Sequence, residues 1–367
     1  MRNFQEEIGA DGKRKSNTSA GFIAQKLGID DNRMFQGLVG VFAVSAIVIG
    51  LLLVAFTSGS GAGPAGSKQP KAIIVIVPGL NPVVLESALN SNKAANLAGL
   101  VTSGAAYGRI ASNATDPTAA LVSLLSGTAA SYHNVSSSSA LGAFQSSAAT
   151  SFLRYLNEAS LKTTLIASAN FYSGSTYNTS GQCSTVGTLD AECAGIACPS
   201  DATSAYCNSA TRVIVNNDDT ALMSTIISNA FSTAAPGNSL VTIVVDAFSS
   251  LRALDDNSLR ALSATALLDG VVGQLVLAAE QRSYKADENW LVTLVGDGVN
   301  SAQQAPLFVI PVSAGSVIRA KSINTATGNI VDIFPTIASW FNLPTTSSFV
   351  VGSVQGICGD GRTVSTC

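Results

Sequence analysis

The sequence is poor in histidine and in charge. It has one histidine, His133, in 367 residues, and charged residues make up 12% of the chain, well below the usual ~25%. Its net charge is −3 and its only basic block is Lys13-Arg14-Lys15, so it lacks the positive surface that nucleic-acid binding requires. Small polar residues take the place of charged residues. A surface with so little charge favours a protein that is covered by partner proteins or by glycans.

One segment near the N-terminus has the length and composition of a membrane span. No charged residue occurs from Met34 to Ser67, and Leu38–Phe56 is nearly all apolar. At 1.5 Å per residue this run is about enough to cross a ~30 Å hydrocarbon core. We predict an uncleaved signal anchor at residues 34–57. Two alternatives stay open: a cleaved signal peptide, because small residues follow the run, and a buried core helix.

Basic residues flank this segment unequally. Four lie within 20 residues on its N-terminal side and two on its C-terminal side: Arg14, Lys15, Lys26 and Arg33, then Lys68 and Lys71. The positive-inside rule therefore predicts a type II single-pass membrane protein. Residues 1–33 form a cytosolic tail, 58–71 a flexible linker, and 72–367 a lumenal or extracellular domain.

The cysteines agree with this topology, because all six follow the membrane segment: Cys183, Cys193, Cys198, Cys207, Cys358 and Cys367. An even number in an oxidising compartment predicts three disulfides, with Cys358–Cys367 as the local pair and the other four closing a Cys-rich insert at 183–207. The spacing is too wide for a zinc knuckle, and no histidine is near. Three sequons on this side predict N-glycans at Asn113, Asn134 and Asn178.

Apolar runs alternate with helical patterns along the lumenal part. The predicted strands are 72–77, 107–112, 163–169, 212–217, 239–248, 289–297 and 305–312, and the predicted helices are 82–104, 117–127, 144–159, 218–234, 258–284 and 329–343. This alternation predicts an α/β fold with a mostly parallel central sheet flanked by helices on both faces, preceded by one transmembrane helix. Chemistry in such sheets lies at the carboxyl ends of the strands, here at Pro78-Gly79, Asp246 and Asp297.

Four segments in order resemble the alkaline phosphatase superfamily, and especially its nucleotide pyrophosphatase/phosphodiesterase branch. They are IVIVPGLNPVVL, PTAALVSLLSGTAASYHNV, NWLVTLVGDGVN and NIVDIFPTIASWFNLP. They are similar to that branch's opening strand and turn, its nucleophile helix, its strand ending in Asp-His-Gly, and its closing helix. The resemblance covers residues 72–344. It implies two zinc ions held by Asp and His side chains, and a Thr or Ser nucleophile at a helix N-terminus.

Carried over residue by residue, this site lacks most of its chemistry. The first-turn Asp falls on Pro78 and the nucleophile on Pro117, beside Thr118. Two Asp/His pairs fall on Asp246 with Ser250 and on Asp297 with Gly298. His133 falls in a turn after the nucleophile helix, away from the ligands. We therefore predict no bound metal or other cofactor, and a catalytically inactive domain with a structural or binding role, as a subunit of a membrane assembly.

Several alternatives stay open. Asp246 and Asp297 could hold a hard divalent metal in an active phosphodiesterase with an atypical site. Thr118 could act as a nucleophile, or an anion could bind at the N-terminus of the 117–127 helix. Pro78 could be an ordinary turn proline in an unrelated α/β protein. Asp332 is expected to cap the closing helix rather than act as a catalytic acid.

Overall fold

The computed structural model describes residues 68–136, 155–156, 158–168, 212–216, 231, 239–245, 258–345, 352–358 and 361. The predicted tail, membrane span and most of the linker lie outside these residues, as do the Cys-rich insert 183–207 and most of the predicted helices at 144–159 and 218–234. Those predictions stay predictions.

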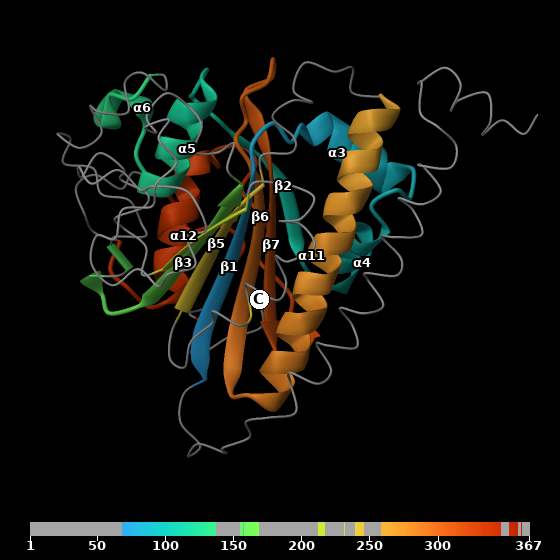
Figure 1. Cartoon of the computed structure of the whole chain (residues 1–367), viewed down its shortest axis with the longest axis vertical. Helices are drawn as coiled ribbons and strands as arrows, with labels where there is room; N and C mark the ends of the chain where they lie inside the picture. The colour runs from blue at the N-terminus through green and yellow to red at the C-terminus, as the bar shows by residue number, and fades with distance from the viewer. Residues whose placement is uncertain are drawn as a thin grey trace, which may run out of the picture. The chain divides into compact units, whose positions relative to one another are not determined.

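The described residues form an eight-stranded sheet with the order β2-β7-β6-β1-β5-β3-β4, in which β8 pairs with β7 (Figure 1). The strands are β1 (Gln69–Val77), β2 (Ala106–Ala111), β3 (Lys162–Ser168), β4 (Arg212–Asn216), β5 (Ser239–Val244), β6 (Glu288–Gly296), β7 (Gln304–Ser313) and β8 (Ser316–Val317). All seven predicted strands are present. Strand β1 lies in the middle, parallel to β5 on one side and to β6 on the other.

The sheet is mixed, because β7 runs antiparallel to both β6 and β2. The connection from β6 to β7 consists only of residues 297–303. A parallel crossover needs a dozen residues or more, so this short turn forces the chain to reverse. The prediction of a mostly parallel sheet therefore needs this correction at β7.

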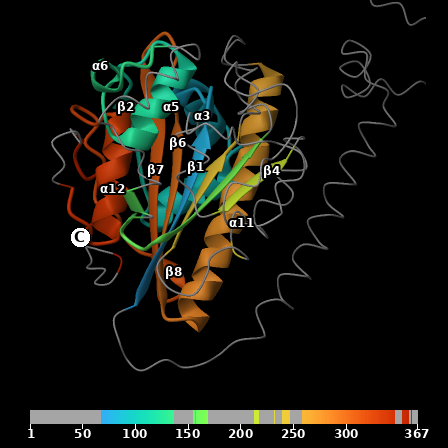
Figure 2. The same ribbon diagram turned by 60° about the vertical axis from the view of Figure 1, so that its left-hand side comes forward.

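Helices cover both faces of the sheet, as predicted (Figures 1 and 2). One face carries α3 (Pro82–Asn90), α4 (Ala95–Ser103) and α11 (Leu259–Lys285), and α11 packs on β6 and β7. The other face carries α5 (Pro117–Ser126), α6 (Ala130–His133), the short 3-10 helix η4 (Ile330–Asp332) and α12 (Ile333–Trp340). Helix α5 ends at Gly127, where the sequence places its end.

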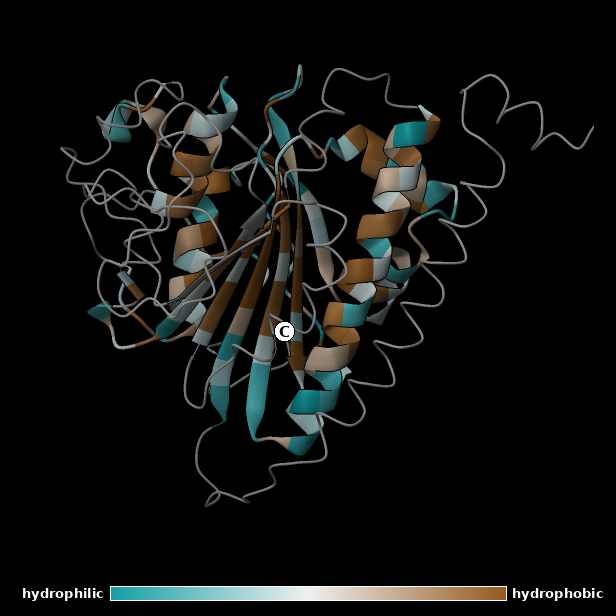
Figure 3. Cartoon of the chain, in the orientation of Figure 1, coloured by the Kyte–Doolittle hydropathy of each residue, from teal (hydrophilic) through white to brown (hydrophobic). Residues whose placement is uncertain are grey.

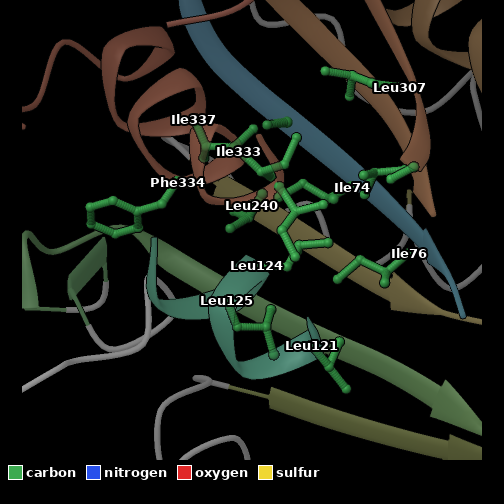
Figure 4. Close-up of a cluster of buried hydrophobic side chains, with 14 of the residues drawn as sticks. Ile74, Ile76, Leu121, Leu124, Leu125, Leu240, Leu307, Ile333, Phe334 and Ile337 are labelled. Carbon is green, nitrogen blue, oxygen red and sulfur yellow. The ribbon is translucent and has the colours of Figure 1, made fainter. Parts of the chain in front are cut away.

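The central strands are mostly apolar beyond their first residues because both of their faces are covered. Every residue of β5 and β6 is buried, and the strands are brown through most of their length in Figure 3. On the α5 face, Ile74 of β1, Leu124 of α5 and Ile337 of α12 pack together (Figure 4). Burying one such side chain stabilises the fold by about 1.5–3 kcal/mol, so this cluster fixes α5 and α12 against the sheet.

Helix α11 is the one helix in the described part of the chain that is long and apolar enough to cross a membrane. Half of its most apolar window is buried, and the helix packs on β6, β7, α3 and α4. These contacts are those of a core helix in an α/β domain. The predicted membrane span at 34–57 lies outside the described residues.

The predicted helix at 82–104 is in fact two helices. The chain leaves α3 through Asn92, which has a left-handed φ of 57°, and restarts at α4. The first amides of α4 are satisfied from another part of the chain, because the buried carboxylate of Asp269 in α11 accepts from the backbone N–H of Asn96 and of Leu97, at 3.2 and 2.7 Å. This partner is far away in sequence, so the local pattern does not reveal the break.

The closing helix also differs in detail from the prediction. It opens with the 3-10 turn η4, whose cap is Asn329 rather than Asp332. The Asp332 side chain accepts from the backbone N–H of Asn329 at 2.9 Å and so completes a reciprocal capping box. Asp332 therefore serves the helix start, as predicted, but from the third position.

Candidate functional site

The carboxyl ends of β1, β5 and β6 meet at one edge of the sheet, where the superfamily places its metals. Val77 is in register with Gly296, so Pro78 and Asp297 follow at neighbouring strand ends. The backbone N–H of Val245 donates to the Ile76 carbonyl at 2.9 Å, which brings the end of β5 alongside. The structure thus places Pro78 and Asp297 side by side, next to the end of β5. Asp246 and Ser250 themselves lie outside the described residues.

Pro78 forms a tight turn at the end of β1. The Leu80 N–H donates to the Val77 carbonyl at 3.2 Å, and Gly79 has a φ of 83°. Proline followed by glycine at positive φ is the pattern of a type II turn. The Pro78 side chain is buried and offers no metal ligand, so this turn holds the strand and the helix in place without supplying chemistry.

Asp297 is 2% exposed, and its carboxylate accepts from the backbone N–H of Val299 at 3.1 Å. The next residue, Gly298, has a φ of 69°. A Cβ atom on Gly298 would lie 2.5 Å from the Cβ of Ser112 and 3.2 Å from the Ala305 nitrogen. Any side chain at this position, including the family's histidine, therefore requires the chain around Ser112 to move.

Sequence reasoning did not single out Ser112. It lies just after β2, is 1% exposed, and its backbone N–H donates to the Gln303 carbonyl at 2.8 Å. This bond holds the segment after β2 against the turn that carries Gly298. No local sequence signal marks Ser112, because its importance comes from packing against a turn that is distant in sequence.

The N-terminus of α5 lies at the same edge and is already capped. Pro117 is its first residue and has no N–H. The Asp116 carboxylate accepts from the backbone N–H of Thr118 and of Ala119, at 2.8 and 3.3 Å. An anion at this end would compete with a carboxylate that holds the same amides. Asp116 was also missed, although an Asp before a Pro that starts a helix is a recognised cap signal.

The single histidine is a structural residue. His133 is fully buried and is the last residue of the short helix α6, which follows α5, rather than part of a turn as the sequence predicted. Its Nδ1 accepts from the Val135 N–H at 3.1 Å, so the proton of the neutral ring is on Nε2, which lies 2.9 Å from the Ser123 Oγ. Burial lowers the pKa of His133 to about 4. The ring therefore donates to Ser123 and cannot accept its proton, which excludes a Ser-His nucleophile here.

A pocket of about 420 Å³ opens beside this edge, on the face that carries α5. The residues that line it are Asn113, Ser123, Ala129, Thr327, Asn329, Ile330, Val331, Asp332 and Ser353. None of them is a cation. The Asp332 carboxylate is fully engaged, because besides the Asn329 N–H it accepts from the Ser353 N–H and the Gln355 Nε2, both at 2.7 Å.

The described residues do not fit the zinc pair of the superfamily. They contain no group of three His, Cys, Asp or Glu side chains that could hold a metal. Of the expected ligand positions in this part of the chain, Asp297 keeps a carboxylate, while Pro78 and Gly298 offer none. Two dications need several carboxylates and imidazoles around them.

The remaining predicted positions are only partly described. Cys358 is disulfide-bonded, and the other cysteines lie outside the described residues, so its pairing with Cys367 stays a prediction. Of the sequon asparagines, Asn113 and Asn134 are exposed, and Asn178 lies outside the described residues.

Comparisons with known proteins recover the fold. No family model and no curated protein matches the sequence. A Bacteroides fragilis protein described as the sulfatase yidJ is 12% identical, with a TM-score of 0.52, over 81% of this chain and 78% of that one. An alkaline phosphatase superfamily protein from Vibrio parahaemolyticus is 12% identical over 82% and 76%, with a TM-score of 0.49. The phosphonate monoester hydrolase from Silicibacter pomeroyi is 14% identical over 78% and 76%, with a TM-score of 0.48.

Sequence identities this low show a similarity of fold and nothing more. The similarity of fold rests on the Bacteroides fragilis structure, which has the TM-score of 0.52. The predicted α/β architecture is thus found in a solved structure, whereas the alkaline phosphatase superfamily and its nucleotide pyrophosphatase branch stay predictions. The fold of this chain is similar to that of the Bacteroides fragilis protein.

Proposed function

We propose that this chain is a single-pass type II membrane glycoprotein whose phosphatase-like domain is catalytically inactive and serves a structural or binding role. The observation that carries the proposal is the contact between Gly298 and Ser112. The position where the superfamily has a metal-binding histidine holds a glycine at positive φ, with 2.5 Å between its Cβ site and the Ser112 Cβ. The close packing at this position leaves no room for the side chain of a metal ligand unless the chain around Ser112 moves.

Neighbouring positions support the same conclusion. Pro78 takes the place of an acid, Pro117 takes the place of the nucleophile, and Asp116 covers the amides of the α5 N-terminus. The sole histidine of the sequence is buried against Ser123. Each change keeps the local backbone well formed while removing a reactive group, which is the pattern of a fold retained for its shape.

A binding role is supported by the outer side of α11. Leu259, Leu267, Leu277 and Tyr284 are 66%, 45%, 52% and 79% exposed. Between Ser263 and Leu277 the only charged residue of the helix is Asp269, which is buried and bonded to Asn96 and Leu97. Exposed apolar side chains on a helix side that has no exposed charge between Ser263 and Leu277 support a surface that another protein covers. We expect a partner subunit in the same membrane to bind there.

Metal content and turnover test the inactive domain. Residues 60–367, which form one compact unit, are secreted from a eukaryotic host, and metals are measured together with hydrolysis of a nitrophenyl phosphodiester. We expect no stoichiometric metal and no hydrolysis above that of the D297N variant. Stoichiometric metal, with hydrolysis lost on chelation and in D297N, would establish the alternative: an active phosphodiesterase with a hard-metal site at Asp246 and Asp297.

Topology and assembly need the full chain. In sealed microsomes we expect protease to remove the N-terminal tail while the rest stays protected, and the opposite pattern would contradict the type II orientation. In native gels of mild detergent extracts, the chain is expected in a complex larger than itself. The L267D/L277D variant is expected to leave that complex, whereas the control S131D, on α6 at the other face of the sheet, stays in it.

A further inference from the structure

The pocket beside α5 has the chemistry of a carbohydrate site rather than an anion site. Its lining residues include no Lys, Arg or His, and its one carboxylate, Asp332, is already engaged. Thr327 and Ser353 are exposed and supply hydroxyls, while Ile330 and Val331 form an apolar floor of which only 1% and 8% is exposed. Hydroxyl groups beside a small apolar surface suit a neutral sugar, which has polar edges and apolar faces. Its volume of about 420 Å³ is in the range of small-ligand sites.

A predicted N-glycosylation site lies in the wall of this pocket. Asn113, the acceptor of the sequon Asn113-Ala114-Thr115, is exposed and lines the pocket. Its neighbour Ala114 is 3% exposed, and the Ala114 N–H donates to the Ser112 Oγ at 3.4 Å. This fixes the backbone from which Asn113 projects. A glycan attached there begins at the pocket itself, so the attachment raises its effective concentration at the lining residues.

We propose that the N-glycan of Asn113 lies in this pocket, with its first sugars beside Thr327 and Ser353 and above the buried residues of η4. The proposal rests on the lumenal placement of the domain proposed above. It also assigns a use to a cavity that lies next to the inactive site and that no reaction in this chain requires. The glycan covers the α5 side of the sheet edge, so it closes that side of the old active site to large ligands.

The chain contains its own control. Asn134 also begins a sequon and is exposed, but it is the C-terminal cap of α6 and is not a lining residue of the pocket. A glycan on Asn134 does not begin at the lining of this pocket. The two glycans, on one protein and attached in one compartment, should therefore differ in how far the protein shields them.

Site-resolved glycan release tests the proposal. The full chain is expressed in a eukaryotic secretory host, purified in detergent and treated with peptide N-glycosidase in its native state, and glycopeptide mass spectrometry follows each asparagine. We expect release from Asn113 to be slower than from Asn134 by about ten-fold, the ratio that about 1.4 kcal/mol of contact produces. After denaturation, both sites should be released at similar rates.

Two kinds of variant separate contact from general crowding. T327W fills the pocket without altering the sequon, and release from Asn113 should become as fast as from Asn134. T115A removes the Asn113 glycan and should lower the melting temperature, whereas S136A removes the Asn134 glycan and should leave it unchanged. Equal native release from both asparagines in the unaltered chain would overturn the proposal.

Occupancy distinguishes this proposal from the topology on which it depends. Glycan on Asn134 with none on Asn113 overturns the pocket proposal and leaves the lumenal placement intact. Absence of glycan from every sequon, together with protease sensitivity of the domain in sealed microsomes, overturns both.

Discussion

Replacing Gly298 by alanine tests the geometric core of the proposed function. The new Cβ would sit at a φ of 69°, which costs a non-glycine residue about 1–2 kcal/mol. It would also lie 2.5 Å from the Ser112 Cβ, and overpacking of this kind costs about 1–3 kcal/mol. G298A should therefore lose about 2–5 kcal/mol of unfolding free energy.

The assay is urea unfolding of residues 60–367 followed by tryptophan fluorescence, with two companions. S112G removes the clashing Cβ, so the double variant S112G/G298A should recover the steric share while keeping the cost of the positive φ. G270A is the matched control, because a Cβ at Gly270 of α11 meets nothing within 4 Å. It should stabilise the helix by about 0.5–1 kcal/mol.

Unchanged stability in G298A would refute the reasoning. It would mean that the turn accepts a side chain freely, and that geometry does not prevent a metal-binding histidine at this position. The next variant to measure would then be G298H, with metal binding as the readout.

Three other predictions concern buried polar groups. The pKa of His133 is lowered by burial to about 4 from 6.5, so the unfolded chain binds more protons between these values and unfolding free energy should fall as pH drops from 6.5 to 4. H133Q should remove this fall in urea midpoints measured at pH 7 and pH 5, and an unchanged slope would contradict the argument. The pKa of Lys71 is lowered by burial to about 8 from 10.5, against the opposing effect of Glu288 and with Arg282 and Lys162 adding to it. Unfolding free energy should therefore rise between pH 8 and pH 10.5, and K71M should abolish that rise. D116A removes the cap of α5 and should cost about 1 kcal/mol of unfolding free energy, measured by thermal unfolding. Phosphate should stabilise D116A more than the unaltered chain, and equal effects would contradict competition between Asp116 and an anion for the same amides.

The sequence predicts the fold well where signals are local. Runs such as Ala72–Val77 and Leu291–Val295 are apolar because both faces of their strands are covered, so their positions are visible from composition alone. The gap between α3 and α4 is not visible, because Asp269, more than 160 residues later, satisfies the amides that restart the helix. The direction of β7 follows from the length of one turn rather than from its own residues.

Some features of the candidate site are also visible in the sequence, whereas others appear only in the folded chain. The topology of the strands predicts that Pro78 and Asp297 lie at one edge, and the register of β1 with β6 confirms it. The meaning of Gly298 depends on Ser112, which only the folded chain brings close. The pocket could not be predicted at all, since its walls come from four separate segments between Asn113 and Ser353.

The place of β1 has a mechanical consequence. It is the first element of the described chain and the central strand of the sheet, bonded to β5 and β6 on its two sides. A pull on the N-terminus acts along the strand, so it loads both ladders in shear and several hydrogen bonds must break at once. A domain anchored to a bilayer through this end would therefore resist a pulling force. The same force on an edge strand would break its hydrogen bonds one after another and detach the strand.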